Sequence, residues 1–174
     1  STAGMLVGLR VAERLGIGWG RRGAPLLVAV RVTPWPVTSA FRILNLARRV
    51  CLWLLSLTRN PVFALSRAEL DSGLFVDGSQ LGAGYGRPTA AGLSAIERLP
   101  SLAAALDTTY SAKSAAALLA RTGRRPAVRL FWSTKSSAPL PPVSPERLAL
   151  APPRMSRWLE RGARASRIKD SGSV

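Results

Sequence analysis

Histidine is missing from the sequence, and cysteine occurs once, as Cys51. Without histidine the chain has no Ser-His-Asp or Cys-His catalytic set and no zinc site with histidine ligands. A single cysteine also excludes a disulfide framework within the chain and a four-cysteine metal site. Cys51 lies among leucines in a helical pattern, so we expect a small buried hydrophobic residue there. Any chemistry of this chain therefore depends on other residue types.

Long hydrophobic runs are lacking too. The longest extends over the eight residues from Val50 to Leu57, whereas a helix that crosses a bilayer needs about 20. We find no pattern of a secretion signal, and an unpaired cysteine suits a reducing compartment. We therefore expect a cytoplasmic protein without a membrane partner. Its 174 residues are enough for one ordinary domain with a hydrophobic core.

Acidic residues are few. Nine Asp and Glu stand against 25 Lys and Arg, which gives a net charge of +16, and only three of the basic residues are lysines. Such a charge suggests nucleic acid or an acidic membrane surface as a partner. The arginines, however, are scattered as pairs, without basic runs or interleaved aromatics, and the basic end from Arg154 to Lys169 fits a solvated amphipathic helix. We expect no nucleic-acid partner, with a basic RNA-associated protein as an alternative.

The first 57 residues follow an α/β order. Apolar residues at positions 5, 9, 12 and 15 share one face of a helix that glycines 16 and 18 end. The β-branched segment from Pro25 to Val32 is typical of a strand buried on both faces. A helix with an apolar period of 3.6 residues extends from Val37 to Leu57. This order predicts a parallel sheet.

The following segments continue this order up to a proline-rich stretch. The expected elements are a strand at Phe75–Asp77, a glycine-rich loop at Gly82–Pro88, a helix from the N-cap Thr89 to Arg98 with Leu93 and Ile96 inward, a buried segment at Leu102–Leu106, a helix at Ala112–Arg121 and a last strand at Ala127–Trp132. We therefore divide the chain into an α/β domain, residues 1–142, and a proline-rich exit with a short basic helix at about 154–161 and a flexible tail, residues 143–174.

Four polar segments lie at the ends of these elements: Ser1-Thr2 with Gly4, Gly84-Tyr85-Gly86, Thr109-Tyr110-Ser111, and Ser133 to Ser137. Free N–H groups at a helix N-terminus make the first segment a candidate cradle for a phosphate. The last segment follows a strand, and ligands of open α/β sheets bind outside the carboxyl ends of strands. Each segment taken alone also has a purely structural explanation, as packing residues, a helix cap or a solvated turn.

The order of the four segments resembles the carboxyl-terminal half of the fold-type II pyridoxal-phosphate enzymes, the tryptophan synthase β-like superfamily. It is most similar to 1-aminocyclopropane-1-carboxylate deaminase and D-cysteine desulfhydrase. Ser1-Thr2-Ala3-Gly4-Met5 resembles the end of their phosphate loop, Gly-Ser-Gly-Gly-Thr-x-Ala-Gly-Leu. Gly84–Pro88 matches their Gly-Tyr-Gly-x-Pro, and Leu106–Ser114 resembles Leu-Asp-Pro-Val-Tyr-[Thr/Glu]-Gly-Lys-[Ala/Ser]. Phe131–Ser137 resembles a strand followed by Thr-x-x-Ser, so the resemblance covers about residues 1–140.

The resemblance implies an incomplete α/β fold with a three-layer parallel sheet, pyridoxal 5'-phosphate as cofactor and a small amino acid as substrate. It gives catalytic roles to Tyr85 and Tyr110, which would line the substrate side of the cofactor. It places Ser111 near the pyridine nitrogen, where a hydroxyl makes the ring a weaker electron sink than a carboxylate does. The remaining cofactor contacts would come from Ser1, Thr2, Gly4, Thr134 and Ser136.

One part of the family's site is outside this sequence. The Schiff-base lysine and the Ser-Asn-His-type substrate loop precede the phosphate loop in the family, and Lys113 matches a structural lysine instead. We therefore expect a piece of an enzyme for deamination or β-elimination, inactive alone, whose partner is the missing amino-terminal segment. A homodimer is compatible with the resemblance. The alternative within this fold is a non-catalytic scaffold.

Overall fold

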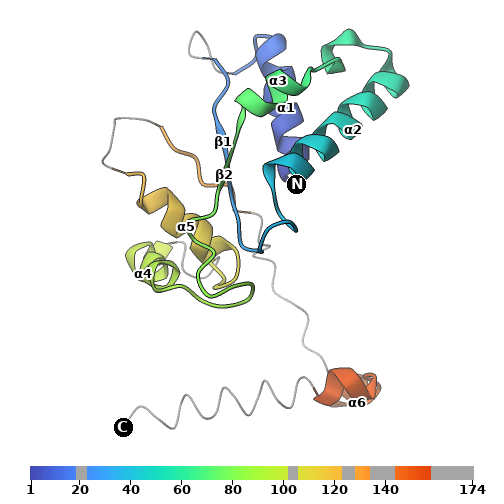
Figure 1. The fold of residues 1–174 in the computed structure, drawn as a ribbon. Helices are drawn as coiled ribbons and strands as arrows, with labels where there is room; N and C mark the ends of the chain where they lie inside the picture. The colour runs from blue at the N-terminus through green and yellow to red at the C-terminus, as the bar shows by residue number, and fades with distance from the viewer. Residues whose placement is uncertain (19–22, 102–105, 123–127, 134–143, 158–174) are drawn as a thin grey trace. The chain divides into compact units, whose positions relative to one another are not determined.

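A computed structural model of the chain describes residues 1–18, 23–101, 106–122, 128–133 and 144–157 (Figure 1). The contact pattern divides the chain into two units, residues 1–137 and 138–174, and each is described by itself. The elements in chain order are α1 (Thr2–Arg14), β1 (Leu27–Val30), α2 (Ala40–Thr58), the 3₁₀ turn η2 (Pro61–Phe63), α3 (Arg67–Ser72), β2 (Leu74–Asp77), α4 (Ala90–Arg98), α5 (Ser111–Leu119) and α6 (Pro145–Ala149).

β1 and β2 form a small parallel sheet. Leu27 pairs with Leu74, and Val30 pairs with Asp77. The chain passes from β1 to β2 through α2, η2 and α3, since parallel strands need a crossover connection (Figure 1). The described part is thus mixed α/β, mostly helical with two parallel strands, and the expected α/β class is confirmed at this level.

The first hydrophobic cluster packs α1 and α2 together with the segment before β2. Its buried members are Ala3, Leu6, Val7, Leu44, Ala47, Cys51, Leu65 and Leu70, and Leu27 and Leu74 of the two strands pack against it. The predicted helix is confirmed as α1, but its buried positions are 3, 6, 7 and 10 and not the apolar positions 5, 9, 12 and 15 that share another face. α1 carries apolar residues on several sides. Its sequence therefore predicts a helix but does not show which side packs against α2.

Arg14 fastens the end of α1 to the segment before β2. Its guanidinium donates to Glu69 Oε1 at 2.6 Å and to the carbonyl oxygen of Ala64 at 3.1 Å. Glu69 also forms a capping box with Ser66 at the start of α3. The side-chain and backbone hydrogen bonds from Ser66, followed by those from Arg14, lower the pKa of Glu69 to about 2. The carboxylate is thus ionised at neutral pH and holds three segments together.

The second hydrophobic cluster packs α4 against α5. Its buried members are Ala95, Leu106, Ala112, Ala115 and Ala116, and Ile96 and Phe131 pack against it. Thr89 caps α4 as predicted, with its Oγ1 accepting from the Gly92 N–H. Leu93, predicted to be inward, is 47% exposed. Small residues occupy this interface instead: Gly92 and Ala95 of α4 and Ala112 of α5 are buried.

Two predictions about strands need correction. Residues 128–132 of the predicted last strand carry no strand, and Val128 is 95% exposed. Their apolar alternation reflects side-chain composition, but a strand also needs a hydrogen-bonded neighbour, and β1 and β2 pair with one another. β1, predicted to be buried on both faces, has four half-buried residues because the described sheet has only two strands.

The second unit contains a helix that the sequence analysis missed. Ser144 caps α6 by accepting from the Arg147 N–H, and Pro145 occupies the first helical position. Residues 153–157 are also helical, at the beginning of the predicted basic helix, and the remainder of that prediction lies outside the described residues. Among the described helices, none has both the length and the apolar character that crossing a bilayer requires.

Candidate functional site

A glycine-rich loop after β2 carries Tyr85. The loop consists of successive turns in which the N–H of Leu81 bonds to Gly78, that of Gly84 to Leu81 and that of Arg87 to Gly84. Gly82 has a φ of 62°, and a Cβ there would meet Thr89 Cγ2 at 2.6 Å. Only glycine meets both conditions without strain. The sequence therefore builds a compact loop that brings Tyr85 back toward the start of α5.

Asp107 organises the turn that carries Tyr110. Its carboxylate accepts from the backbone N–H groups of Thr109, Tyr110 and Ser111 and from the Ser111 hydroxyl at 2.6 Å. Burial by itself raises the pKa of Asp107, but these hydrogen bonds outweigh it and lower the pKa to about 2. An ionised carboxylate therefore caps the first turn of α5, immediately after Tyr110.

The two turns bring Tyr85 and Tyr110 together. Their Oη atoms share a hydrogen bond of 2.5 Å, and their rings meet edge to face with centroids 6.0 Å apart. Both side chains are about half exposed, at 55% and 50%. The hydrogen bond with Tyr85 raises the pKa of Tyr110. Two residues 25 positions apart in the chain thus form one polar contact that a bound molecule can reach.

Lys113 lies in the first turn of α5, three residues after Tyr110. It is completely buried, and its Nζ donates to the carbonyl oxygens of Leu81 at 3.0 Å and of Gly84 at 3.3 Å. Those carbonyls belong to the loop that carries Tyr85. The resemblance implies a structural role for Lys113. The loop could not be predicted as its partner, because residues about 30 positions apart leave no local signal.

The end of β2 is joined to the end of α5 by an ion pair. Arg121 donates to Asp77 Oδ2 at 2.6 Å, and its guanidinium lies over the Phe75 ring. Burial raises the pKa of Asp77, but hydrogen bonds from Ser79 and the contact with Arg121 lower it overall. α5 therefore holds the β2 end at one point and the following loop at another.

Arg31 lies at the carboxyl ends of the two strands. Its backbone N–H donates to the Asp77 carbonyl, which continues the pairing of β1 with β2. A Cβ on Gly78 would approach Arg31 Nη2 to 2.9 Å, so the guanidinium fits closely over this glycine. The Arg31 Nε atom is buried without a hydrogen-bond partner. A cationic donor with unused capacity thus lies beside the first residue of the Tyr85 loop.

The other predicted site residues are placed as follows. Ser1, Thr2 and Gly4 occupy the amino-terminal end of α1, where the Ser1 side chain makes no capping bond and the space around Gly4 is open. The described residues show no hydrogen bond from this end to the tyrosine pair. The Ser111 hydroxyl is directed at Asp107, so its contact with a cofactor stays a prediction. Thr134 and Ser136 lie outside the described residues.

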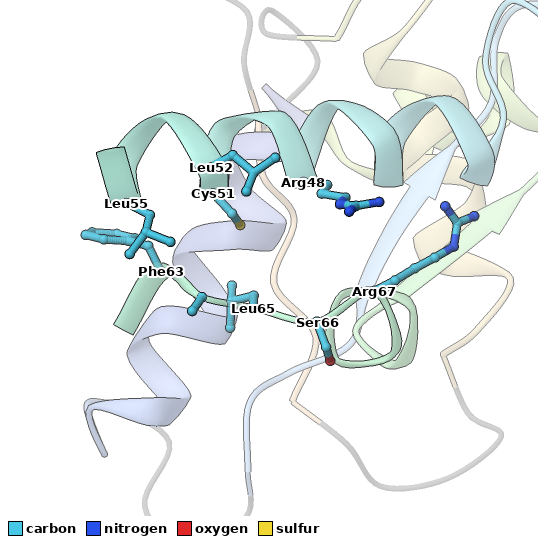
Figure 2. Close-up of a pocket in the computed structure, with 9 residues that line it drawn as sticks. Arg48, Cys51, Leu52, Leu55, Phe63, Leu65, Ser66 and Arg67 are labelled. Carbon is cyan, nitrogen blue, oxygen red and sulfur yellow. The ribbon is translucent and has the colours of Figure 1, made fainter. Parts of the chain in front are cut away.

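A separate groove lies between α2 and the segment before α3 (Figure 2). Its volume is about 430 Å³, and its lining consists of Arg48, Cys51, Leu52, Leu55, Phe63, Ala64, Leu65, Ser66 and Arg67. Burial raises the pKa of the Cys51 thiol, which keeps it protonated at neutral pH and fits the predicted hydrophobic role. None of the predicted site residues lines this groove, and we do not assign it to the tyrosine site.

Within the described residues no group of acidic and cysteine side chains could hold a metal ion. Comparison of the chain with protein-family models, with curated proteins and with solved structures finds no match. The assignment of a function therefore depends on the sequence motifs and on the geometry of the two tyrosine-bearing turns.

Proposed function

We propose that this chain is part of a pyridoxal-phosphate-dependent enzyme that deaminates a small amino acid or eliminates its β-substituent. The observation that carries the proposal is the hydrogen bond between Tyr85 and Tyr110. The resemblance assigns these two residues, from separate motifs, to one side of one cofactor. Motifs that matched by chance would have no reason to meet at hydrogen-bonding distance.

The proposal includes a larger sheet of three layers in the complete protein. Two features support it: β1 and β2 are parallel with a helical crossover, and the helices form two separate hydrophobic clusters. Parallel sheets occur almost only with helices covering both faces. The complete enzyme would be cytoplasmic, with the amino-terminal segment that carries the Schiff-base lysine as its essential partner.

The described residues fit an anionic ligand at the carboxyl ends of the strands. Arg31 has a buried Nε without a partner and lies over Gly78, where no side chain intervenes. A guanidinium at that edge is chemically suited to a phosphate or a carboxylate. The open amino-terminal end of α1, with Ser1, Thr2 and Gly4, would supply hydroxyl and N–H donors to the cofactor phosphate.

When bound, pyridoxal phosphate supplies an electron sink for a carbanion. The chain's own contribution is the neutral phenol pair. Because the hydrogen bond with Tyr85 raises the pKa of Tyr110, the Tyr110 phenol keeps its proton at neutral pH. One phenol donates to the other, so one O–H remains for the substrate. That proton can pass to a departing sulfur or nitrogen while the remaining phenol donates to the phenolate left behind.

The test is turnover by the protein encoded by the complete reading frame that contains this chain. With D-cysteine or 1-aminocyclopropane-1-carboxylate as substrate, we expect ammonia release, and sulfide release from D-cysteine. Tyr85→Phe and Tyr110→Phe each remove one member of the phenol pair and should lower kcat by about 100-fold. Trp53→Phe changes an exposed aromatic residue on α2 and serves as the control.

Substrate turnover that is unchanged in both tyrosine variants would contradict the roles of Tyr85 and Tyr110. Absence of ammonia with these and other small amino acids would contradict the enzymatic function itself.

A further inference from the structure

We propose that Lys113 is a positioning residue, which fixes the glycine-rich loop so that Tyr85 meets Tyr110. The importance of this contact for catalysis rests on the proposed function, but the positioning itself rests only on the structure. Lys113 is completely buried, and both of its hydrogen bonds go to main-chain carbonyls of the loop, those of Leu81 and Gly84.

The chemistry of a buried ammonium makes these bonds strong constraints. A buried cation is normally paired with a carboxylate, because removal of its hydration is costly. Arg10–Glu13, Arg14–Glu69 and Arg121–Asp77 are ion pairs among the described residues, and none of these three includes Lys113. The Leu81 and Gly84 carbonyls therefore take the place of water and of a counter-ion. Displacement of the loop would leave the charge without compensation.

The geometry connects these bonds to the tyrosine contact. Gly84 is the residue immediately before Tyr85, so its carbonyl fixes the peptide unit that carries the tyrosine. Tyr110 is the N-cap residue of α5, and Lys113 lies three positions later in the same helical turn. The first turn of α5 thus holds both phenols, because it carries Tyr110 directly and binds the loop of Tyr85 through Lys113. The backbone hydrogen bonds between residues of the loop are all short-range turn bonds.

Photo-oxidative coupling of tyrosines to fluorescent dityrosine tests the inference at neutral pH. The 174-residue chain contains two tyrosines, so dityrosine in its monomer can join only Tyr85 to Tyr110. We expect the wild-type chain to give a strong monomer signal and Tyr85→Phe to give none. Lys113→Met should lose most of the signal while the helical circular dichroism is retained. Lys113→Arg, which keeps the charge and the donors, should recover part of it.

Arg121→Met is the matched control. It removes another cation that joins α5 to the β2 region, but its partner is the Asp77 side chain and not the loop. A general loss of stability would lower the signal in both variants, whereas loss of loop positioning affects only the Lys113 variants. A signal in Lys113→Met equal to that of the wild type, or equally reduced in Arg121→Met, would overturn the proposal.

If Lys113→Met does not fold, the same measurement is made on Lys113→Gln, which can still donate to one carbonyl. Failure of both variants to fold would also overturn the proposal, because Lys113 would then act on the whole domain. No cofactor or substrate is present in this experiment. A positioning effect in the chain, together with no turnover by the protein from the complete reading frame, would therefore reject the proposed function and keep the inference.

Discussion

Asp107 and Lys113 determine where the two phenols lie, although their hydrogen bonds go to backbone groups or to the Ser111 hydroxyl and not to a phenol. Asp107 orders the turn that carries Tyr110, and Lys113 holds the loop that carries Tyr85. Both side chains lie on the same short stretch at the start of α5. The contact between the tyrosines therefore depends on Asp107 and Lys113 as well as on the tyrosines themselves.

Asp107→Ala should destabilise the domain by about 1 kcal/mol at pH 7, because it removes the carboxylate that caps α5. The pKa of Asp107 is about 2 in the folded chain, below the value of about 3.9 expected after unfolding. The stabilisation is therefore complete above about pH 4 and is lost as the pH falls toward 2. Urea unfolding of both proteins at several pH values measures this difference.

Asp71→Ala is the control for the change in charge, since Asp71 lies exposed in α3. It should alter stability by no more than about 0.5 kcal/mol. A difference between wild type and Asp107→Ala that stays constant down to pH 2 would contradict the role given to the ionised carboxylate.

The helices of the first unit owe their positions to burial more than to local preference. Leu44 is buried against α1, whereas Leu57 of the same helix is 62% exposed. Leu44→Ala should therefore cost about 3 kcal/mol of unfolding free energy, and Leu57→Ala about 0.5 kcal/mol. Thermal or urea unfolding measures both. Equal effects of the two substitutions would contradict the described packing of α2 on α1.

Local sequence signals predicted the elements whose ends are marked by caps, glycine or proline in the sequence. α2 and α4 were found from their apolar period and the caps, and β2 from a short apolar segment before glycines. The predicted last strand is absent from its described residues, 128–132, and the apolar face noted for α1 is not the buried one, because pairing and packing partners lie far away in the chain. Periodicity identifies a helix more reliably than the side on which it is covered.

The candidate site was predictable only in part, for the same reason. The motifs identified Tyr85 and Tyr110, but the sequence did not show that Lys113 binds the loop or that Arg121 pairs with Asp77, 44 residues away. Asp107 carries the one signal that was available, a carboxylate just before a helix that accepts from its first N–H groups. The motif resemblance by itself does not predict this role of Asp107.

Across the whole molecule, positive charge exceeds the acidic residues that could neutralise it. The described ion pairs use Glu13, Glu69 and Asp77, each bound to an arginine, while the net charge is +16. The excess of basic over acidic residues gives the chain a positive field. This field suits anionic ligands such as a phosphate, and it also keeps the RNA-associated alternative open to test by the salt dependence of RNA binding.

Cofactor retention by the protein from the complete reading frame tests the proposed binding of pyridoxal phosphate. The protein is incubated with excess pyridoxal phosphate, desalted, and its visible absorption and phosphate content are measured. We predict a coloured protein that retains about one cofactor per chain, as a single site in each chain would hold. A colourless protein without bound phosphate would contradict the account.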